Sequence, residues 1–421
     1  MSQCEGTAEF DAIIVGSGPS GATIGRELSK KRKKVLLLER GSDAPPKDGL
    51  RGYLSVLNGV PVSDNVAVAR AFTAGGTTAV YFAVAAEPPV SVFASMGVDL
   101  AKQAEEAKQE LPLSILPDEL YGPEAIRLRE SALALGYPWR KNPMLVDMAK
   151  CRGGYNSGAK WNARAFLEEA LAAEATLRTG AEALRVLTDG HRAVGVEYRN
   201  GRGNEVRRVF GKRVILAAGA AASPLLLRRS GVANAGRDGF YFSPSVAVFG
   251  EIDGLRVRGG LVGAMGASLD GGLALGDGNF AAVLYKLLML RNRQWTRALF
   301  RPQSVGIGVI AKDPLDGGLG DNDRYYKKLP RETLEKLNQG AKMASGILRH
   351  AGAKRIFTTS VNAAQMGGTI RINEHIDSNL ETEVRNLHVC DGSVIPGVVS
   401  SPTLTLICLG KYLAGRLLDK I

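Results

Sequence analysis

A short apolar strand that runs directly into a glycine-rich turn is the feature of this sequence that most restricts its fold. Residues 12–15 (AIIV) predict a buried parallel strand, residues 16–21 (GSGPSG) a tight turn, and residues 22 to about 31 a helix. A second apolar run, 35–38 (VLLL), ends at Glu39, 18 residues after Gly21. This order of strand, turn, helix, strand and acid predicts an α/β, Rossmann-like domain that binds a dinucleotide.

The residues of this unit have separate expected roles. Gly16 permits the tight turn, Gly18 lets a pyrophosphate approach the backbone, and Gly21 lets helix and strand pack closely. The carboxylate of Glu39 can accept hydrogen bonds from ribose hydroxyls and would repel a 2′-phosphate, so NADP is disfavoured while FAD and NAD remain open. The other residues that we expect to contact the cofactor at this turn are Pro19, Ser20 and Arg40.

Four further segments decide between FAD and NAD. They are 75–78 (GGTT), 151–160 (CRGGYNSGAK), 214–227 (VILAAGAAASPLLL) and 386–407 (NLHVCDGSVIPGVVSSPTLTLI). Together they resemble the glucose–methanol–choline (GMC) family of flavin oxidoreductases, and the last match is the most specific. Tyr155 stands where the family has a second cysteine. The resemblance implies an FAD-dependent oxidoreductase and leaves mainly residues 241–355 without a match.

The resemblance also implies where the flavin is held. The family packs its GGSS or GGST backbone against the flavin ring, and the helix after its PTLT segment points its positive N-terminus at flavin N1 and C2=O. Relatives that bind FAD covalently use a His or Cys near GGST; residues 79–82 (AVYF) hold neither, so we expect dissociable FAD. The additional cofactor contacts implied here are Gly75, Gly76, Thr77, Thr78, Ala218, Gly219, Asp391, Gly392, Pro402 and Thr403.

The sequence departs from the family at the expected catalytic base. Oxidation of an alcohol needs a group that takes the hydroxyl proton while hydride passes to flavin N5. The family's His position holds Ala364, and the residue before the PTLT proline, usually Asn or His, is Ser401, with Ser400 able to share that place. The candidate catalytic groups are Gln365, Ser401 and Tyr81, of which the first two do not take a proton near neutral pH without help.

The histidines and cysteines offer no clear substitute. We expect His388 to be structural, His191 and His350 to lie at the surface, and His375 to lie in a linker that could fold back to the flavin. Tyr241 and Ser243 are expected in the core. The four cysteines are scattered without a CxxC pair, so neither a zinc site nor a disulfide framework is predicted, and no metal is expected.

The family resemblance implies a discontinuous domain layout. The FAD-binding domain would comprise residues 1–90, 148–240 and 356–421, and the substrate domain residues 91–147 and 241–355. The substrate domain would be an antiparallel sheet facing the flavin with helices behind it, and the alternation in residues 243–249 fits a strand of that sheet. Relatives commonly run longer, so the pocket is expected to be open or covered by another subunit or a membrane surface.

The charge balance bears on partners and location. Lys and Arg number 54 against 42 Asp and Glu, a formal charge of +12, and no acidic residue occurs between positions 278 and 312. Within this stretch, residues 285–301 combine Arg and Lys with Trp, Leu and Phe, which suits a peripheral membrane or subunit contact but also a helix beside a substrate pocket. Nucleic-acid binding is not expected. With no signal peptide and no apolar run of about 20 residues, a cytoplasmic setting is expected, with association at the cytoplasmic membrane face left open.

These observations leave three functions in competition. The first is an FAD-dependent, GMC-like dehydrogenase that oxidises a CH–OH group of a small organic substrate and passes electrons to a quinone, dye or protein acceptor rather than to oxygen. The second is a flavoenzyme on the same scaffold with lyase, decarboxylase or C=C redox chemistry, as the loss of a histidine at position 364 would permit. The third is a flavin-binding subunit that a partner completes.

Overall fold

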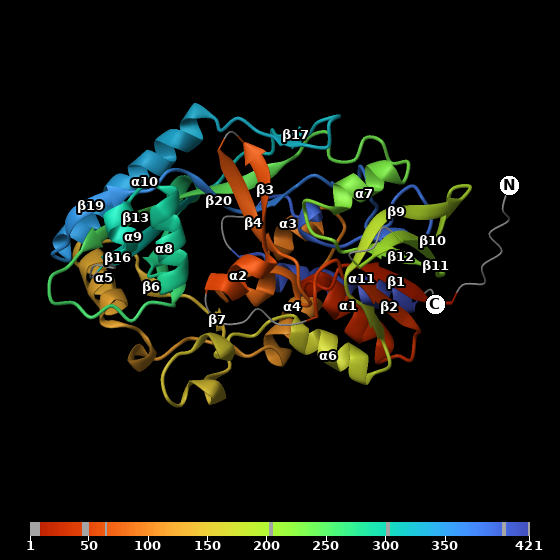
Figure 1. Ribbon diagram of the computed structural model, residues 1–421, viewed down its shortest axis with the longest axis horizontal. Coiled ribbons are helices and arrows are strands. Elements are labelled where there is room, and N and C mark those ends of the chain that lie inside the picture. The colour runs from red at the N-terminus through yellow and green to blue at the C-terminus, as the bar shows by residue number, and fades with distance from the viewer. Residues whose placement is uncertain are drawn as a thin grey trace.

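The chain is organised around two large β-sheets (Figure 1). The computed structural model describes residues 9–43, 50–63, 65–201, 205–299, 304–397 and 401–419. The smaller of the two sheets is wholly parallel and the larger mainly antiparallel.

The parallel sheet confirms the predicted α/β, Rossmann-like fold. Its strand order is β21-β12-β1-β2-β8. Its strands are β1 (Ala12–Val15), β2 (Val35–Leu38), β8 (Thr176–Arg178), β12 (Val214–Leu216) and β21 (Leu387–Val389). Every residue of β1 and β2 is buried, because α1 (Pro19–Ser29) packs on the sheet, as do the antiparallel strands β9 (Ala181–Asp189) and β10 (Arg192–Asn200). Helices α6 (Arg164–Ala172) and α11 (Thr403–Leu418) pack against α1, and β11 (Val206–Phe210) pairs with β10.

Charged side chains tie the covering helices together. Arg26 of α1 pairs with Glu110 of α4 (Ala101–Glu110) at 2.6 Å, and Lys411 of α11 pairs with the same Glu110 at 2.8 Å. Glu27 of α1 contacts both cations. Three helices distant in the sequence therefore share one ion-pair network that holds α1 and α11 side by side.

The large sheet has the strand order β3-β4-β20-β13-β16-β15-β14-β6, with β19 beside β13. Its strands are β3 (Leu57–Ser63), β4 (Val66–Ala71), β6 (Arg140–Lys141), β13 (Tyr241–Glu251), β14 (Val262–Leu269), β15 (Leu273–Gly278), β16 (Ser304–Ala311), β19 (Lys354–Thr358) and β20 (Asn362–Gly367). The strand predicted at 243–249 is thus confirmed within β13. Its residues are buried on both faces, because α10 (Arg331–His350) packs on one side and α8 (Ala282–Arg291) and α9 (Trp295–Leu299) contribute to an apolar cluster with Phe249 on the other.

The predicted domain boundaries stay a prediction. The large sheet takes β3, β4 and β20 from ranges that the prediction assigns to the cofactor domain, and β20 joins β4 by a parallel pairing at Ala363 and Val68. One sheet therefore contains strands from both predicted domains.

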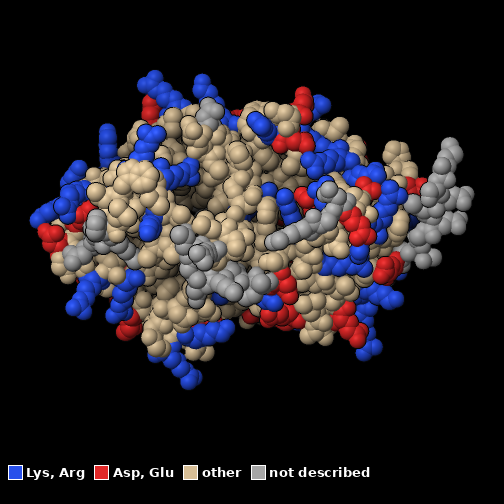
Figure 2. All heavy atoms as spheres, viewed as in Figure 1, with Lys and Arg blue, Asp and Glu red and all other residues tan. Residues whose placement is uncertain are grey.

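Further short elements complete the fold. They are α2 (Leu50–Val56), α3 (Val90–Ser95), α5 (Pro123–Ala134), α7 (Ser223–Arg229) and the short strands β5 (Leu113–Ser114), β7 (Met144–Leu145), β17 (Gly318–Leu319) and β18 (Tyr325–Tyr326). Cys151, Cys390 and Cys408 are buried and free, and Cys4 lies outside the described residues. Over the described ranges, no helix combines the length and apolarity that crossing a membrane requires. Figure 2 shows Lys and Arg spread around the rim of one face rather than gathered in a stripe.

Candidate cofactor and substrate site

The turn at residues 16–21 connects the carboxyl end of β1 to α1, and two of its glycines are required by close backbone contacts. Gly16 has a φ of 104°, and a Cβ added there would lie 2.3 Å from the carbonyl oxygen of Ala217. A Cβ at Gly21 would lie 2.1 Å from the oxygen of Gly16. A Cβ at Gly18, by contrast, would meet no heavy atom within 4 Å. The turn is therefore closed on its inner side and open at Gly18, as a phosphate cradle needs.

Glu39 ends β2 beside this turn, and its buried carboxylate is held in place by three donors. Oε2 accepts hydrogen bonds from the Ser17 amide (3.2 Å) and hydroxyl (2.5 Å), and Oε1 accepts one from the Gly41 amide (2.7 Å). Burial raises the pKa of Glu39, while these hydrogen bonds act in the opposite direction. Ser17 is not among the residues predicted from the sequence, although its place inside the glycine-rich turn was the available signal.

The GGTT segment folds against the same turn. The Gly75 amide donates to the Ser17 hydroxyl at 3.3 Å, and a Cβ at Gly76 would lie 3.0 Å from the Cα of Gly18. The hydroxyl of Thr78 donates to the Gly75 carbonyl at 2.5 Å, and that of Thr77 accepts from the Ala71 amide at 3.2 Å. The two threonines therefore shape the turn with these bonds, and the backbone of Gly75 and Gly76 lies against the glycine-rich turn, while their contact with the flavin stays a prediction.

Asp391 joins the turns that follow β12 and β21. Its Oδ2 accepts from the Gly219 amide at 2.9 Å and from the Ser223 hydroxyl, and its Oδ1 accepts from the amide (2.9 Å) and hydroxyl (2.7 Å) of Ser393. Burial raises the pKa of this carboxyl, against the effect of the four hydrogen bonds. Asp391 is thus a clamp between two turns, whereas the sequence predicted it only as a contact of the cofactor.

Three predicted cofactor contacts, Ala218, Gly219 and Gly392, are neighbours of this clamp. A Cβ at Gly219 would meet no heavy atom within 4 Å, so this turn also faces open space. Ala218 packs partly buried against the main core. The oxygen of Gly392 would lie 2.4 Å from a Cβ at Gly367, the last residue of β20. The large sheet therefore meets the parallel sheet at its carboxyl edge.

Helices α1 and α11 run in the same direction with their N-termini at this edge. The Ser20 hydroxyl donates to the carbonyl of Leu406 at 3.1 Å, and one turn later a Cβ at Gly410 would lie 2.9 Å from the Cβ of Thr23. Neither helix has an acidic residue in its first turn. Two positive helix ends and two open glycines fit a ligand with negative charge, and the cradle therefore fits the predicted dinucleotide.

Four predicted residues have more specific positions. Pro19 is the first residue of α1, and Pro402 is the N-cap residue of α11, directly before the first helical residue. Thr403 begins α11, is buried and shares a 3.2 Å hydrogen bond with the hydroxyl of Ser401. The guanidinium of Arg40 lies 4.4 Å from the centre of the Phe72 ring and 3.3 Å from Glu182.

The candidate catalytic groups lie in three separate segments of the chain. Gln365 of β20 donates from Nε2 to the Ser243 hydroxyl at 3.1 Å, and its neighbour Ala364 is exposed. Tyr81 donates its hydroxyl to the carbonyl of Trp161 at 2.5 Å, and burial raises its pKa well above the ordinary value. Ser401 precedes α11, and Ser400 lies outside the described residues. Their catalytic roles stay predictions.

The histidines are held elsewhere. His191 is exposed between β9 and β10 and His350 is exposed at the end of α10, which confirms both as surface residues. His375 is buried in a local turn, where its Nδ1 accepts from the Arg371 amide at 3.1 Å. His388 is buried within β21, which lowers its pKa to about 4 and confirms a core position. Tyr241 and Ser243 are buried as expected.

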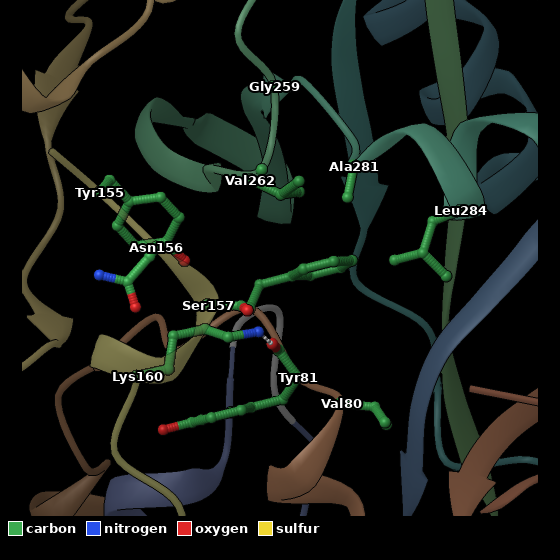
Figure 3. Close-up of a pocket in the computed structure, with 12 residues that line it drawn as sticks. Val80, Tyr81, Tyr155, Asn156, Ser157, Lys160, Gly259, Val262, Ala281 and Leu284 are labelled. Atoms are coloured by element: carbon green, nitrogen blue, oxygen red, sulfur yellow. Dashed lines mark hydrogen bonds between the residues drawn. The ribbon is translucent and has the colours of Figure 1, made fainter. Parts of the chain in front are cut away.

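A cavity of about 170 Å³ lies beyond the GGTT turn (Figure 3). Its lining comes from residues 80–82, from the loop at 155–160 and from the segments around 259–262 and 281–284. In Figure 3 the ammonium of Lys160 donates to the Tyr81 carbonyl at 2.9 Å, with Val262 and Leu284 on the opposite wall. None of the lining residues is Asp or Glu. Lys160 is not among the site residues predicted from the sequence, although its place in the GAK motif was the available signal.

Comparisons with known proteins agree with this geometry. A family model described as GMC oxidoreductase matches residues 10–263. An uncharacterized GMC-type oxidoreductase of Mycobacterium tuberculosis is 31% identical over 252 residues, which are 53% of this chain and 39% of that protein. This chain thus spans about two fifths of the length of that relative. An uncharacterized protein of Methanocaldococcus jannaschii is 23% identical over 97% of this chain and 100% of its own length.

Two solved structures share the fold. Pyridoxine 4-oxidase from Mesorbium loti has a TM-score of 0.74 at 16% identity, covering 97% of this chain and 99% of its own. Formate oxidase from Aspergillus oryzae has a TM-score of 0.78 at 14% identity, covering 98% of both chains. At these identities the likeness concerns the fold alone. A shorter match, 46% identical over 18% of this chain and 14% of that protein, is to the oxygen-dependent choline dehydrogenase of Escherichia coli.

Proposed function

The chain belongs to the GMC oxidoreductase family, and from this premise we propose that it is a dehydrogenase acting on a CH–OH group of a small organic substrate. As a member of the family it is an oxidoreductase and a flavoprotein whose cofactor is FAD. The observation that carries the proposal is the convergence of the turns after β1, β2 and β12 with the GGTT segment at one edge.

The residues at this edge have distinct roles in the proposal. Bound FAD supplies the two-electron redox chemistry that side chains lack. The open backbone at Gly18 and the helix ends of α1 and α11 hold its diphosphate. Glu39, oriented by its hydrogen bonds with Ser17, accepts hydrogen bonds from the ribose hydroxyls. Gln365 orients the substrate hydroxyl, and the cavity beside Lys160 takes the rest of the substrate.

We assign the electrons to an acceptor other than oxygen, namely a quinone, a dye or a protein. The support is the exposed apolar pair on α9, Trp295 at 60% and Leu299 at 68% exposure, next to the exposed cations Lys286 and Arg293. This surface suits a peripheral membrane or subunit contact. Residues 300 and 301 of the predicted 285–301 segment lie outside the described residues. Rapid peroxide formation during turnover in air would contradict this acceptor.

An anaerobic absorption experiment tests the substrate class. The purified protein, reconstituted with FAD, is mixed without oxygen with primary, secondary and sugar alcohols, and the oxidised flavin band near ~450 nm is followed. Bleaching by an alcohol is the expected result and names the class. An unchanged spectrum with every alcohol would contradict the dehydrogenase proposal.

A second candidate follows from Ala364. In β20 the family's histidine position carries an exposed methyl group, and the neighbouring Gln365 does not take a proton near neutral pH. This arrangement favours a flavoenzyme with lyase, decarboxylase or C=C redox chemistry, none of which needs a base to take a hydroxyl proton at that position. This second candidate would be favoured if no alcohol bleaches the bound flavin, but an enone, or a carboxylic acid under illumination, changes the flavin absorption spectrum.

A further inference from the structure

Two arginines flank one aromatic ring beside the cofactor cradle. The guanidinium of Arg70, the last residue but one of β4, lies 4.7 Å from the centre of the Phe72 ring, and that of Arg40 lies 4.4 Å from it. The two cations beside this ring repel each other, and a nearby anion would offset that repulsion.

The two charges are not balanced equally. Arg40 has Glu182 at 3.3 Å. Over the described residues, Arg70 makes no ion pair and its guanidinium donates no hydrogen bond, and its Nε is fully buried. Burial and then the charge of Arg40 lower the pKa of Arg70 to about 10. A guanidinium with a buried, unpaired donor is costly, and an anion that accepts from it would remove the cost.

The position of Arg70 indicates which anion. On one side Phe72 touches the segment after β2, since a Cβ at Gly41 would lie 2.1 Å from the Phe72 carbonyl carbon. On the other side Tyr325 is near enough to affect the pKa of Arg70. The Tyr325 hydroxyl donates to the carbonyl of Ala220 at 3.0 Å, directly after Gly219. The two residues beside Arg70 therefore contact the segments that follow β2 and β12, and β1 with its open Gly18 lies between those two strands.

We propose that Arg70 is a binding residue for the diphosphate of the dinucleotide, with Arg40 as a second cation on the adenosine side. The inference rests on the FAD assignment above. A guanidinium suits this role because its planar donors match phosphate oxygens in pairs. The sequence alone does not indicate a role for Arg70, because a polar residue at this point of an alternating strand is ordinary.

The first test is an FAD titration of the flavin-free protein, followed by quenching of flavin fluorescence. Arg70→Met keeps much of the side-chain length and removes the charge, and it should raise the Kd for FAD roughly 10- to 100-fold, as expected for a charged hydrogen bond to phosphate. The matched control is Arg331→Met, whose side chain is 92% exposed, and its Kd should stay within about twofold of wild type. An unchanged Kd for Arg70→Met would overturn the inference.

The second readout separates binding from folding. Without flavin, Arg70→Met should have the same Tm as wild type or a higher one, because it removes a half-buried cation beside Arg40 whose buried Nε has no hydrogen-bond partner among the described residues. A lower Tm for the flavin-free variant, with an equal loss of affinity for FAD and for riboflavin, would assign Arg70 a structural role and overturn the proposal. Riboflavin lacks phosphate, so its affinity should not change.

The third arm identifies the source of the phosphate. Inorganic pyrophosphate should compete with FAD for the wild-type protein and not for Arg70→Met. Pyrophosphate that instead stabilises the FAD-loaded protein would point to a free phosphate ligand and overturn the proposal. A wild-type protein that binds no FAD would overturn the cofactor assignment itself, whereas normal FAD binding by the variant would overturn the role of Arg70 alone.

Discussion

Replacing Asp277 by Asn should change how the stability of the protein depends on pH. Asp277 lies in β15, is 1% exposed, and accepts one hydrogen bond at Oδ1, from the Met265 amide at 2.7 Å. Its Oδ2 is buried without a partner among the described residues. Burial, with a smaller contribution from the nearby carboxylate of Glu124, raises the pKa of Asp277 to about 7.

The sign of the effect follows from proton binding. The unfolded carboxyl titrates near ~3.9, so between about pH 4 and 7 the native state holds a proton that the unfolded state has lost. The contribution of the protonated Asp277 carboxyl to the free energy of unfolding is fully present below pH 4, and it is lost as the pH rises through 7. At about 1.4 kcal/mol per pH unit over roughly three units, the upper limit is about 4 kcal/mol.

Urea unfolding of wild type and Asp277→Asn at pH 5, 6, 7 and 8 measures this dependence. The variant keeps the Oδ1 acceptor and cannot ionise, so it should be about 2–3 kcal/mol more stable than wild type at pH 8, with the gap closing toward pH 5. The exposed Asp270, in the turn between β14 and β15, serves as control, and Asp270→Asn should show no such trend. A gap that is constant with pH, or that grows toward low pH, would refute the reasoning.

The same region supports the cavity wall. The Glu124 carboxylate accepts from the amides of Arg258 and Gly259 at 3.2 and 2.8 Å, and the Gly260 amide donates to the carbonyl of Asn279 at 2.7 Å. Gly259 and Gly260 line the cavity. Stability changes at Asp277 are therefore measured beside the candidate substrate pocket.

Three further substitutions test other parts of the site. Gly21→Ala places a Cβ 2.1 Å from the Gly16 oxygen and should lower the Tm and abolish FAD binding. The Cβ of Gly18→Ala faces open space, so this variant should keep the Tm of wild type while its affinity for FAD falls about tenfold or more. Equal Tm values for the two variants would contradict the cradle geometry. Asp391→Ala leaves the donors of Gly219, Ser223 and Ser393 without their acceptor and should cost about 3–5 kcal/mol in urea unfolding, and a loss under 1 kcal/mol would show that the two turns hold without the clamp. Ala364→His should speed anaerobic flavin bleaching by alcohols, with Ala363→His as control, and equal rates in both variants would remove position 364 from the site.

The sequence by itself determined the parts of this protein that depend on neighbouring residues. The strand Ala12–Val15, the turn to Gly21, the helix after it and the acid at Glu39 were all predicted, because turn geometry and helix starts are set by backbone conformations within a few residues.

Only the tertiary structure decided how distant segments complete the site. Asp391 accepts a hydrogen bond from Gly219, 172 residues away in the sequence, and Ser17 forms hydrogen bonds with both Glu39 and Gly75. Lys160 donates to the backbone carbonyl of Tyr81, and the guanidinium groups of Arg70 and Arg40 lie beside the same aromatic ring. The sequence placed Asp391 near the pyrophosphate but not as a clamp, and it left Arg70 unnoticed. The spacing of residues constrains the chain only locally, whereas these contacts depend on how the sheets and helices pack around one edge.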